Sequence, residues 1–297
     1  MATMATAELK PSPRWRRARN VFSGYALILP ALLLVGLIIV YPAIRSIIVT
    51  LTTQADGSPA AFTLDQYTSF FTDTLSTTNL LYTLRVALEV VAILFLIAFP
   101  ICLYLRFSKS RIANVIHFLT LFPLFVPGIV LAYALIRFTI THGMLASILA
   151  ALGINNYTTL YLTTQGIMFG LVWEGIPFTT LILNAALIQI DDALIDSARD
   201  VGANAWQIFT RIMLPLIKDA VVIIFALQFL MILGSYTIPY LMGPAEPEMM
   251  GVFMQRTYQD VQNPVQAQTQ AVVTFVIAAL AGYVYVRTVA SQQKGQE

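Results

Sequence analysis

The chain has 297 residues, of which 58% are apolar and 11% are charged, and its formal net charge at pH 7 is +2. Roughly a quarter of the residues in ordinary soluble domains are charged, so this composition excludes a soluble enzyme and a disordered chain and predicts an integral membrane protein. A net charge so near zero also offers no basic face to nucleic acid. The single cysteine, Cys102, excludes a disulfide framework and a cysteine-based metal site, and we expect it to pack as a small apolar residue.

Six long apolar runs locate the predicted membrane-spanning helices, because a helix needs about 20 apolar residues to cross the hydrocarbon layer. The first four predicted spans are residues 21–44, 84–105, 112–136 and 165–190. The fifth lies within residues 220–245 and the sixth within residues 261–286. A transmembrane β-barrel would show alternating segments of about ten residues, and none appear. The sequence therefore predicts an all-α polytopic membrane protein with six transmembrane helices, the third of them kinked by Pro123 and Pro127.

The basic residues predict how these helices are oriented. With the N-terminus in the cytoplasm, 13 of the 17 Lys and Arg residues fall on the cytoplasmic side, which is the side they favour. The arginine-rich start resembles a signal peptide, but its apolar run is too long and lacks a convincing cleavage site, so we expect a retained first span. The predicted organisation is a basic cytoplasmic tail over residues 1–20, a transmembrane domain over residues 21–290 and a second cytoplasmic tail over residues 291–297.

Three loops are expected on the opposite side of the membrane, over residues 46–83, 137–164 and 243–260. Within the second loop, residues 142–153 are predicted to form a short amphipathic helix that packs over the bundle as a lid. A lone histidine such as His142 seldom binds a ligand, so a structural role is favoured for it.

The second span carries two charges, Arg85 and Glu89. Their spacing of four residues places both side chains on one face of a helix, where they can pair. Pairing is the usual way in which a membrane protein tolerates such charges, so a structural ion pair is favoured over a substrate site.

The loop over residues 191–218 is polar and is expected in the cytoplasm. Residues 193–199 are predicted to form one short helix, which Gly202 can end because glycine tolerates a positive φ. Asn204 is the expected N-cap of a second helix over residues 205–213, which Pro215 ends or kinks. Two short helices at an angle would project from the bundle as a knob that another protein could approach closely. An ordinary amphipathic hairpin is the alternative interpretation.

The spacing within this loop resembles the EAA motif of the membrane subunits of binding-protein-dependent ABC importers. That motif reads Glu-Ala-Ala, three residues, Gly, nine residues and Ile-x-Leu-Pro. Here Asp196-Ser197-Ala198 precedes Gly202 by three residues, and Ile212-Met213-Leu214-Pro215 follows after nine. Asp and Ser replace the motif's Glu and first Ala but keep the charge and the small size. A Trp and a Pro before the loop, Trp173 and Pro177, also match the family, and the resemblance covers about residues 80–290.

The resemblance implies a type I ABC importer permease with a core like that of the maltose permease, in a bacterial inner membrane. It implies three kinds of partner: a second permease subunit, usually a different chain, a dimer of ABC ATPase subunits, and an extracytoplasmic solute-binding protein. The residues implied in docking the ATPase are Asp196, Ser197, Ala198, Gly202 and Ala203, with Leu214 and Pro215 as the hinge into the fifth span.

No phosphate-binding motif of the G-x-x-x-x-G-K-[ST] kind occurs in the chain. The chain is therefore expected to be no enzyme and to hold no cofactor or metal of its own, while ATP and magnesium would bind to the partner ATPase.

The resemblance to the maltose permease also implies a substrate site between the fourth and fifth spans. The residues assigned to it are Trp173, Glu174, Phe178, Gln228, Met231, Ser235 and Tyr236. Glu174 is predicted near the middle of its span, where a lone carboxylate is costly unless it faces a cavity or a positive partner. Aromatic rings beside a carboxylate suit a protonated amine. The same set could also bind a sugar, and Glu174 could instead pair with the partner permease.

The expected solute is small and polar. Residues 235–244 look more like the spermidine/putrescine permease branch than like oligosaccharide permeases, which favours a polyamine or a related cation. A sugar or a glycerophosphodiester is the alternative solute. An ion-coupled secondary transporter would show a relay of intramembrane charges and an internal repeat. A channel-forming or structural membrane protein would leave the loop at residues 191–218 unexplained.

Overall fold

The computed structural model describes residues 28–52 and 61–294 of the chain. The chain divides into two compact units, Met1–Leu64 and Asp65–Glu297. Among the described residues the secondary structure is helical, apart from one isolated bridge between Thr52 and Phe62 in the first unit. The predicted all-α class is therefore confirmed.

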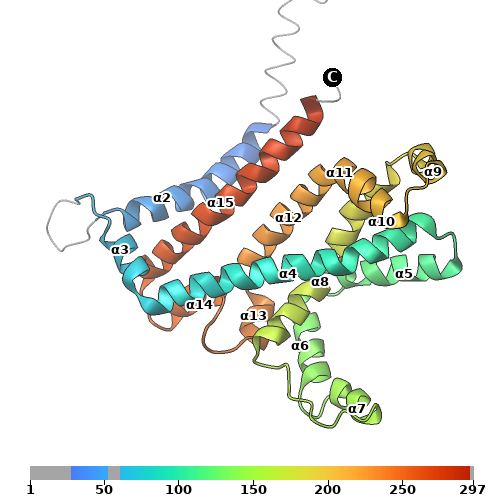
Figure 1. Cartoon of the computed structure of the whole chain (residues 1–297). Coiled ribbons are helices and arrows are strands. Elements are labelled where there is room, and N and C mark those ends of the chain that lie inside the picture. Colours follow the sequence, from blue (N-terminus) through green and yellow to red (C-terminus); the bar gives the residue numbers. More distant parts are fainter. Residues whose placement is uncertain (1–27, 53–60, 295–297) are drawn as a thin grey trace, which may run out of the picture. The chain divides into compact units, whose positions relative to one another are not determined.

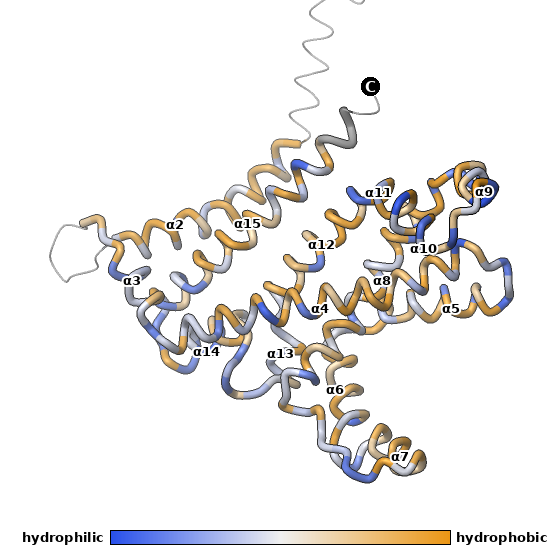
Figure 2. The backbone as a smooth tube through the Cα atoms, viewed as in Figure 1, coloured by the Kyte–Doolittle hydropathy of each residue, from blue (hydrophilic) through white to orange (hydrophobic). Residues whose placement is uncertain are grey.

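The described part of the first unit contains one long helix, from Ile28 to Thr50, which includes a π-helical turn at Gly36–Val40 and α2 at Tyr41–Thr50. None of its most apolar stretch is buried within the chain, and Figure 2 shows α2 as largely hydrophobic. A helix with apolar side chains all around suits a lipid-facing span. The predicted span at residues 21–44 begins outside the described residues, and the helix continues past its predicted end to Thr50.

The second unit is a bundle of long helices with shorter helices at their ends (Figure 1). The long helices are α4 (Thr74–Phe107), α8 (Thr164–Ile188), α12 (Lys218–Leu233) and α15 (Pro264–Lys294). The shorter helices are α3 (Asp65–Thr72), α5 (Arg111–Leu121), α6 (Gly128–Thr139), α7 (Met144–Ala151), α9 (Asp192–Asp200), α10 (Ala205–Ile208), α11 (Leu214–Leu216), α13 (Thr237–Met242) and α14 (Met250–Gln259).

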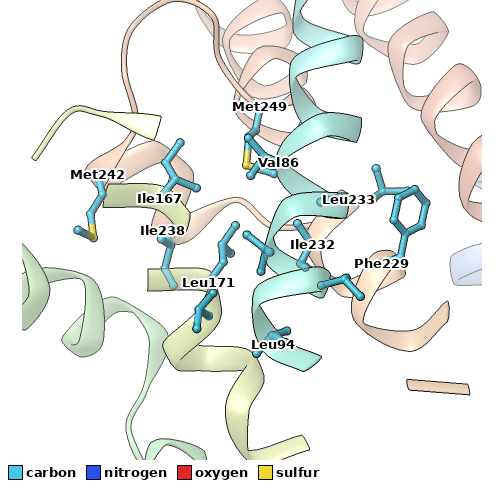
Figure 3. Packing of buried hydrophobic residues seen from close by; sticks show 14 of the residues in the cluster. Val86, Leu94, Ile167, Leu171, Phe229, Ile232, Leu233, Ile238, Met242 and Met249 are labelled. Atoms are coloured by element: carbon cyan, nitrogen blue, oxygen red, sulfur yellow. The ribbon is translucent and has the colours of Figure 1, made fainter. Parts of the chain in front are cut away.

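The main hydrophobic core lies where α4 packs against α8 and α12. Figure 3 shows Leu94 of α4, Leu171 of α8 and Ile232 of α12 meeting there. Gly175 allows this close approach, because a β-carbon at that position would lie only 2.7 Å from Cδ1 of Leu94. A side chain at position 175 would therefore require Leu94 or the two helices to shift.

Helix α4 is ten residues longer at its start than the predicted span, because it begins at Thr74 with Asp73 as its N-cap. These additional turns were expected to belong to the loop over residues 46–83. Their polar groups have partners: Oδ1 of Asn79 accepts a hydrogen bond from the backbone N–H of Glu248 at 3.0 Å, and Oγ1 of Thr83 accepts one from that of Met250 at 2.8 Å. The start of α4 is therefore fixed to the loop between α13 and α14.

The predicted third span, residues 112–136, is wrong as a single helix. Helix α5 ends at Leu121, a 3-10 turn covers Phe122–Phe125, and α6 starts at Gly128. Pro123 and Pro127 lack the N–H that a continuous helix needs, and Val126 is extended, as a residue before proline prefers. The two prolines break the helix instead of kinking it.

The short helix predicted at residues 142–153 is present as α7. No residue of α7 is buried, however, so the prediction that it packs over the bundle as a lid is wrong. Its sequence, Met-Leu-Ala-Ser-Ile-Leu-Ala-Ala, is apolar on every side, so no polar face directs one side of it toward the bundle.

Within residues 28–52 and 61–294, five helices are long and apolar enough to cross a membrane, and the number is six when the bent pair Ala205–Leu216 and Lys218–Leu233 counts as one span. The predicted count of six therefore agrees, although the third span runs over Gly128–Ala151 and the fifth is bent by 71°. The fifth predicted span is also interrupted after Leu233, and the chain becomes helical again at Thr237.

Candidate functional site

A cleft of about 190 Å³ lies between α8, the end of α12 and α13, beside the start of α6. Its polar lining comes from Glu174 and Gly175 on α8, Gln228 on α12, and Ser235, Tyr236 and Thr237 at the interruption. Five of the seven predicted substrate residues are therefore brought together around one cavity: Glu174, Gln228, Met231, Ser235 and Tyr236.

Glu174 carries the only carboxylate among the residues that line this cleft. Its side chain is exposed in the isolated chain, and no cationic side chain in the described part of the chain pairs with it. Its Oε1 lies 3.7 Å from the place where a β-carbon on Gly128 would stand, at the first residue of α6. The positive end of the α6 dipole stabilises negative charge there.

Gln228 forms the fixed wall of the cleft. Its side-chain N–H group donates to the backbone oxygen of Gly175 at 3.0 Å and to Oγ1 of Thr179 at 2.9 Å, and Thr179 in turn donates to the same Gly175 oxygen at 2.9 Å. All three residues are buried, so these bonds join α8 to α12 inside the protein, where a hydrogen bond is stronger than in water. The space beside Gly175 is filled by Leu94 and by Gln228.

The interruption after α12 supplies further groups for binding. The side chains of Ser235, Tyr236 and Thr237 form no hydrogen bond among the described residues, and all three line the cleft. The C-terminal end of the 16-residue α12 lies at the same place, and the dipole of a helix is negative at that end. Unwound chain inside a span is tolerated where it lines a cavity, and such breaks often bind a solute.

A second cleft of about 340 Å³ shares Tyr236 with the first. In its wall, Oε1 of the buried Glu248 pairs with Nη2 of Arg256 at 2.6 Å. Burial raises the pKa of Glu248, while the charge of Arg256 acts in the opposite direction. The ring of Tyr236 stacks on that of Tyr240 with centroids 5.1 Å apart. The sequence offered no signal for this ion pair, because Glu248 lies in a loop and Arg256, eight residues further along, lies in α14.

The remaining two predicted substrate residues lie outside the cleft. Trp173 lines an apolar groove of about 520 Å³ together with Phe138 and Phe169, whose rings stack with each other. Phe178 is 41% exposed and lies one turn beyond Glu174 on α8, next in the chain to Thr179, whose hydroxyl accepts the bond from Gln228.

The second predicted functional region is the α9–α11 segment, which we define as residues 191–217. Helix α9 ends at Asp200, and Gly202 has a φ of +84° that closes it, as predicted. Asn204 caps α10 through a reciprocal capping box with Gln207. The chain bends by 71° where α11 meets α12, directly after Pro215. The predicted knob of two short helices is therefore present.

The exposed side chains of the α9–α11 segment differ from those that the motif suggested. Asp196 accepts a hydrogen bond from Arg199 at 3.1 Å, and both side chains are exposed. Ala198 is 9% exposed and packs against the bundle, so it faces inward. Ser197 and Gly202 are exposed, and two apolar side chains that the sequence did not single out, Val201 and Trp206, are 85% and 71% exposed.

No group of three His, Cys, Asp or Glu side chains in the described residues lies close enough together to hold a metal ion. Cys102 is buried in a cluster of apolar side chains that includes Ala98 and Leu183, as expected of a packing residue, and its Sγ lies 3.5 Å from the backbone oxygen of Thr180.

Comparison with known proteins covers nearly the whole chain. The family described as "Binding-protein-dependent transport system inner membrane component" matches residues 2–291. The spermidine/putrescine transport system permease protein PotB of Escherichia coli (strain K12) is 27% identical over 248 residues, which are 82% of this chain and 90% of PotB. The sulfoquinovosyl glycerol transport system permease protein SmoG of Agrobacterium fabrum (strain C58 / ATCC 33970) is 24% identical over 311 residues, which are 97% of each chain.

Solved structures share the fold. A chain from a bacterial ABC transporter involved in the import of the acidic polysaccharide alginate matches with a TM-score of 0.70 at 19% identity, over 92% of this chain and 98% of the other. A chain of the MetNI methionine ABC transporter, in an inward-facing conformation, matches with a TM-score of 0.54 at 19% identity, over 72% and 94% of the two chains. At these identities the likeness shows the arrangement of helices alone.

Proposed function

This chain belongs to the family of binding-protein-dependent transport system inner membrane components, and we propose that it forms part of the pathway for a small cationic solute of the polyamine type. Membership makes the chain a multi-pass permease subunit of an ABC importer in the inner membrane. The identity of the solute goes beyond the family, and the unpaired carboxylate of Glu174 in its cleft is the observation that carries it.

The cleft has the charge pattern that a protonated amine requires. Glu174 supplies a full negative charge, the end of α12 adds a partial one, and Tyr236 offers an aromatic ring to the cation. A carboxylate inside a span is costly unless it is neutralised. An alkylammonium solute supplies that neutralising charge, and the start of α6 stabilises the carboxylate while the cleft is empty. The identity of 27% to PotB, a spermidine/putrescine permease protein, supports the same class of solute.

The partners follow from the kind of importer. We place both termini and the α9–α11 segment in the cytoplasm, where the excess of Lys and Arg favours them. Two ATPase subunits, which bind ATP and magnesium, dock on the α9–α11 segment. A second permease subunit completes the pathway, and an extracytoplasmic binding protein delivers the solute. The similar alginate importer was solved with a pentasaccharide-bound periplasmic protein, an arrangement that agrees with this set of partners.

The docking surface in this proposal consists of the exposed residues Asp196, Ser197, Gly202, Val201 and Trp206. Apolar side chains of this exposure on an otherwise polar segment are typical of a surface that another protein covers. Ala198 and Ala203 hold the segment to the bundle from its other side.

Transport then depends on a rigid movement of this segment. When the two ATPase subunits close on ATP, they displace α9 and α10, and the bend after Leu214 and Pro215 passes the displacement to α12. The end of α12 lines the cleft, so the cleft opens to one side of the membrane or to the other according to the nucleotide state.

A sugar-containing solute is the second candidate, because SmoG, a sulfoquinovosyl glycerol permease protein, matches 97% of the chain. Ser235, Thr237 and Tyr236 would then donate and accept hydrogen bonds with the hydroxyl groups of such a solute. A glycerophosphodiester is less well suited, because Glu174 would repel its phosphate.

Two measurements test the solute: the unfolding temperature of the cognate binding protein, and uptake by proteoliposomes that contain the complete importer. We expect putrescine or spermidine, and not a sugar, to raise the unfolding temperature of the binding protein. In Glu174→Gln the shape is kept and the charge is lost, so uptake at low solute concentration should fall at least about tenfold, the effect of losing roughly one charge-assisted hydrogen bond. The matched control is Glu89→Gln, because Glu89 pairs with Arg85 at 2.7 Å and does not line the cleft.

Uptake of the cation by an assembled Glu174→Gln importer with unaltered apparent affinity would show that Glu174 is not a solute ligand. Dissociation of the two permease subunits in this variant would show that Glu174 pairs with the partner permease. Stabilisation of the binding protein by a sugar alone would select the second candidate.

The docking surface is tested by Gly202→Glu against Gly202→Ala. Both variants carry the same backbone strain, because the φ of +84° disfavours any side chain, but only Glu adds bulk and charge in the open space around this position. We expect ATPase subunits to co-purify with the Ala variant and not with the Glu variant. Equal association in both would mean that this surface does not bind the ATPase.

A further inference from the structure

Arg106, in the last turn of α4, has a guanidinium group that reaches across to the end of another helix. Its Nε donates to the backbone oxygen of Leu187 at 3.1 Å, and its Nη2 donates to that of Ile190 at 2.9 Å. The same Nη2 pairs with Oδ1 of Asp192, in the first turn of α9. The side chain is only 14% exposed. One arginine thus bonds to α8 and α9 from the end of α4.

These contacts supply bonds to carbonyl groups at the end of a helix and to a carboxylate, and the oxygen of Leu187 also accepts a bond from the backbone N–H of Ile190 at 3.3 Å. The last carbonyl groups of a helix have no bond within the helix, and the negative end of its dipole attracts a cation. The planar guanidinium can bond to two carbonyl groups and a carboxylate at once, which an ammonium group on lysine cannot do in the same geometry. The three bonds therefore fix α9 at a defined angle to α4 and α8.

The next residue along α4 holds the other end of α9. The guanidinium carbon of Arg199 lies over the ring of Phe107, 5.8 Å from its centroid. Arg199 is in the last turn of α9, whereas Asp192 is in its first turn. Two neighbouring residues at the end of α4 therefore contact both ends of α9, and a displacement of α9 moves the end of α4.

We propose that Arg106 is a positioning residue that transmits the movement of the α9–α11 segment to α4 and α8. The inference rests on the proposed function, in which the ATPase subunits displace this segment. It adds a second route from that segment to the cleft: the bend at Pro215 acts on α12, whereas Arg106 acts on α8, which carries Glu174. Both walls of the cleft then move together with the ATPase.

The experiment measures solute transported per ATP hydrolysed by the complete importer in proteoliposomes, together with co-purification of the ATPase subunits. In Arg106→Gln we expect this ratio to fall at least about fivefold, the lower end of common coupling strengths, with the ATPase subunits still bound. In Asp192→Asn the change should be smaller, because that carboxylate is 72% exposed and the two carbonyl bonds remain. The control is Arg111→Gln, an exposed arginine five residues further along the chain.

An Arg106→Gln importer that keeps the wild-type ratio would overturn the proposal. So would a loss of transport that occurs only together with loss of the ATPase subunits, because Arg106 would then serve to fold the docking surface. If Arg106→Gln does not assemble, Arg106→Lys decides: a ratio below wild type supports the proposal, and a wild-type ratio overturns it. Failure of Gly202→Glu to release the ATPase would instead contradict the docking proposal, whatever Arg106 does.

Discussion

The carboxylate of Glu174 lies beside Gly128, with Oε1 3.7 Å from the position that a β-carbon on Gly128 would take. Glu174 belongs to α8 and Gly128 is the first residue of α6. The prolines at positions 123 and 127 separate α6 from α5. Because Gly128 has no side chain, the start of α6 can stand next to the carboxylate without covering it. The break between α5 and α6 thus has a consequence for the cleft.

Substitution of Gly128 should therefore act through the size of the new side chain. In Gly128→Ala the β-carbon meets Glu174 at an ordinary contact distance, so uptake should stay near wild type. In Gly128→Leu the larger side chain covers Glu174, and uptake should fall at least about tenfold, as it does when binding geometry is lost. The control is Gly282→Leu, where nothing lies within 4 Å of an added β-carbon. Wild-type uptake by Gly128→Leu would exclude this cleft from the pathway.

Gln228 should matter for stability as well as for solute binding. Gln228→Leu keeps a similar volume but removes the bonds to Gly175 and Thr179. We expect a loss of about 1–3 kcal/mol in the free energy of unfolding, the usual effect of leaving buried polar groups with fewer partners. Denaturant unfolding in detergent measures it, with the exposed Gln189→Leu as the control. Equal stability of the two variants would show that these bonds do not hold α8 to α12.

The contact between Gly175 and Leu94 can be tested by a double-mutant cycle. Gly175→Ala should destabilise the protein by about 1–3 kcal/mol, because its β-carbon would lie 2.7 Å from Cδ1 of Leu94. Leu94→Ala alone should cost about 2–5 kcal/mol by leaving a cavity. Together they should cost less than the sum by at least about 0.5 kcal/mol, because the new methyl group fills part of that cavity. Additive costs would mean that α4 and α8 adjust independently of this contact.

Asp73 should make the stability of the second unit depend on pH. Its carboxylate accepts hydrogen bonds from the backbone N–H and the hydroxyl of Ser76, at 2.9 and 2.6 Å, and the hydroxyl bond is the main cause that lowers the pKa of Asp73. Because the folded pKa is below the unfolded one, the stabilisation is complete above the ordinary value of about 4 and is lost as the pH falls through the folded pKa.

Asp73→Asn keeps a capping group without the charge, so wild type should exceed it in stability above about pH 5 and approach it below about pH 4. Asp73→Ala removes the cap and should be less stable than Asp73→Asn by about 1 kcal/mol at every pH. Unfolding followed by circular dichroism at several pH values measures these differences. A gap between wild type and Asp73→Asn that does not change with pH would contradict the assignment.

Features of the fold that depend on local sequence could be predicted, and features that depend on distant partners could not. Gly202, Asn204 and Pro215 act on their own few residues, and the structure has the helix end, the cap and the bend where the sequence predicted them. The first turns of α4 were missed because Asn79 and Thr83 are polar, and only their bonds to residues 248 and 250, far along the chain, explain why they are buried in a helix.

The candidate site shows the same division. Glu174, Gln228 and Tyr236 meet at one cleft, as the family resemblance implied. Trp173 lies apart from them because the neighbour of Glu174 on a helix points about 100° away from it, into a separate groove. Arg106 was counted only as a basic residue near a membrane surface, since nothing in the sequence shows that its partners come from residues 187, 190 and 192.

Pro100 divides α4 into two arms of unequal length, with Arg106 on the short arm and Asn79 on the long one. At 1.5 Å per residue the arms measure about 9 Å and about 32 Å. Tilting of α4 as one rigid helix about the level of Pro100 would turn a shift of about 1 Å at Arg106 into one of about 3.5 Å at Asn79. In mechanical terms α4 is a lever whose far end moves further than the end that carries Arg106. At that far end Asn79 bonds to the backbone of the loop that borders the second cleft.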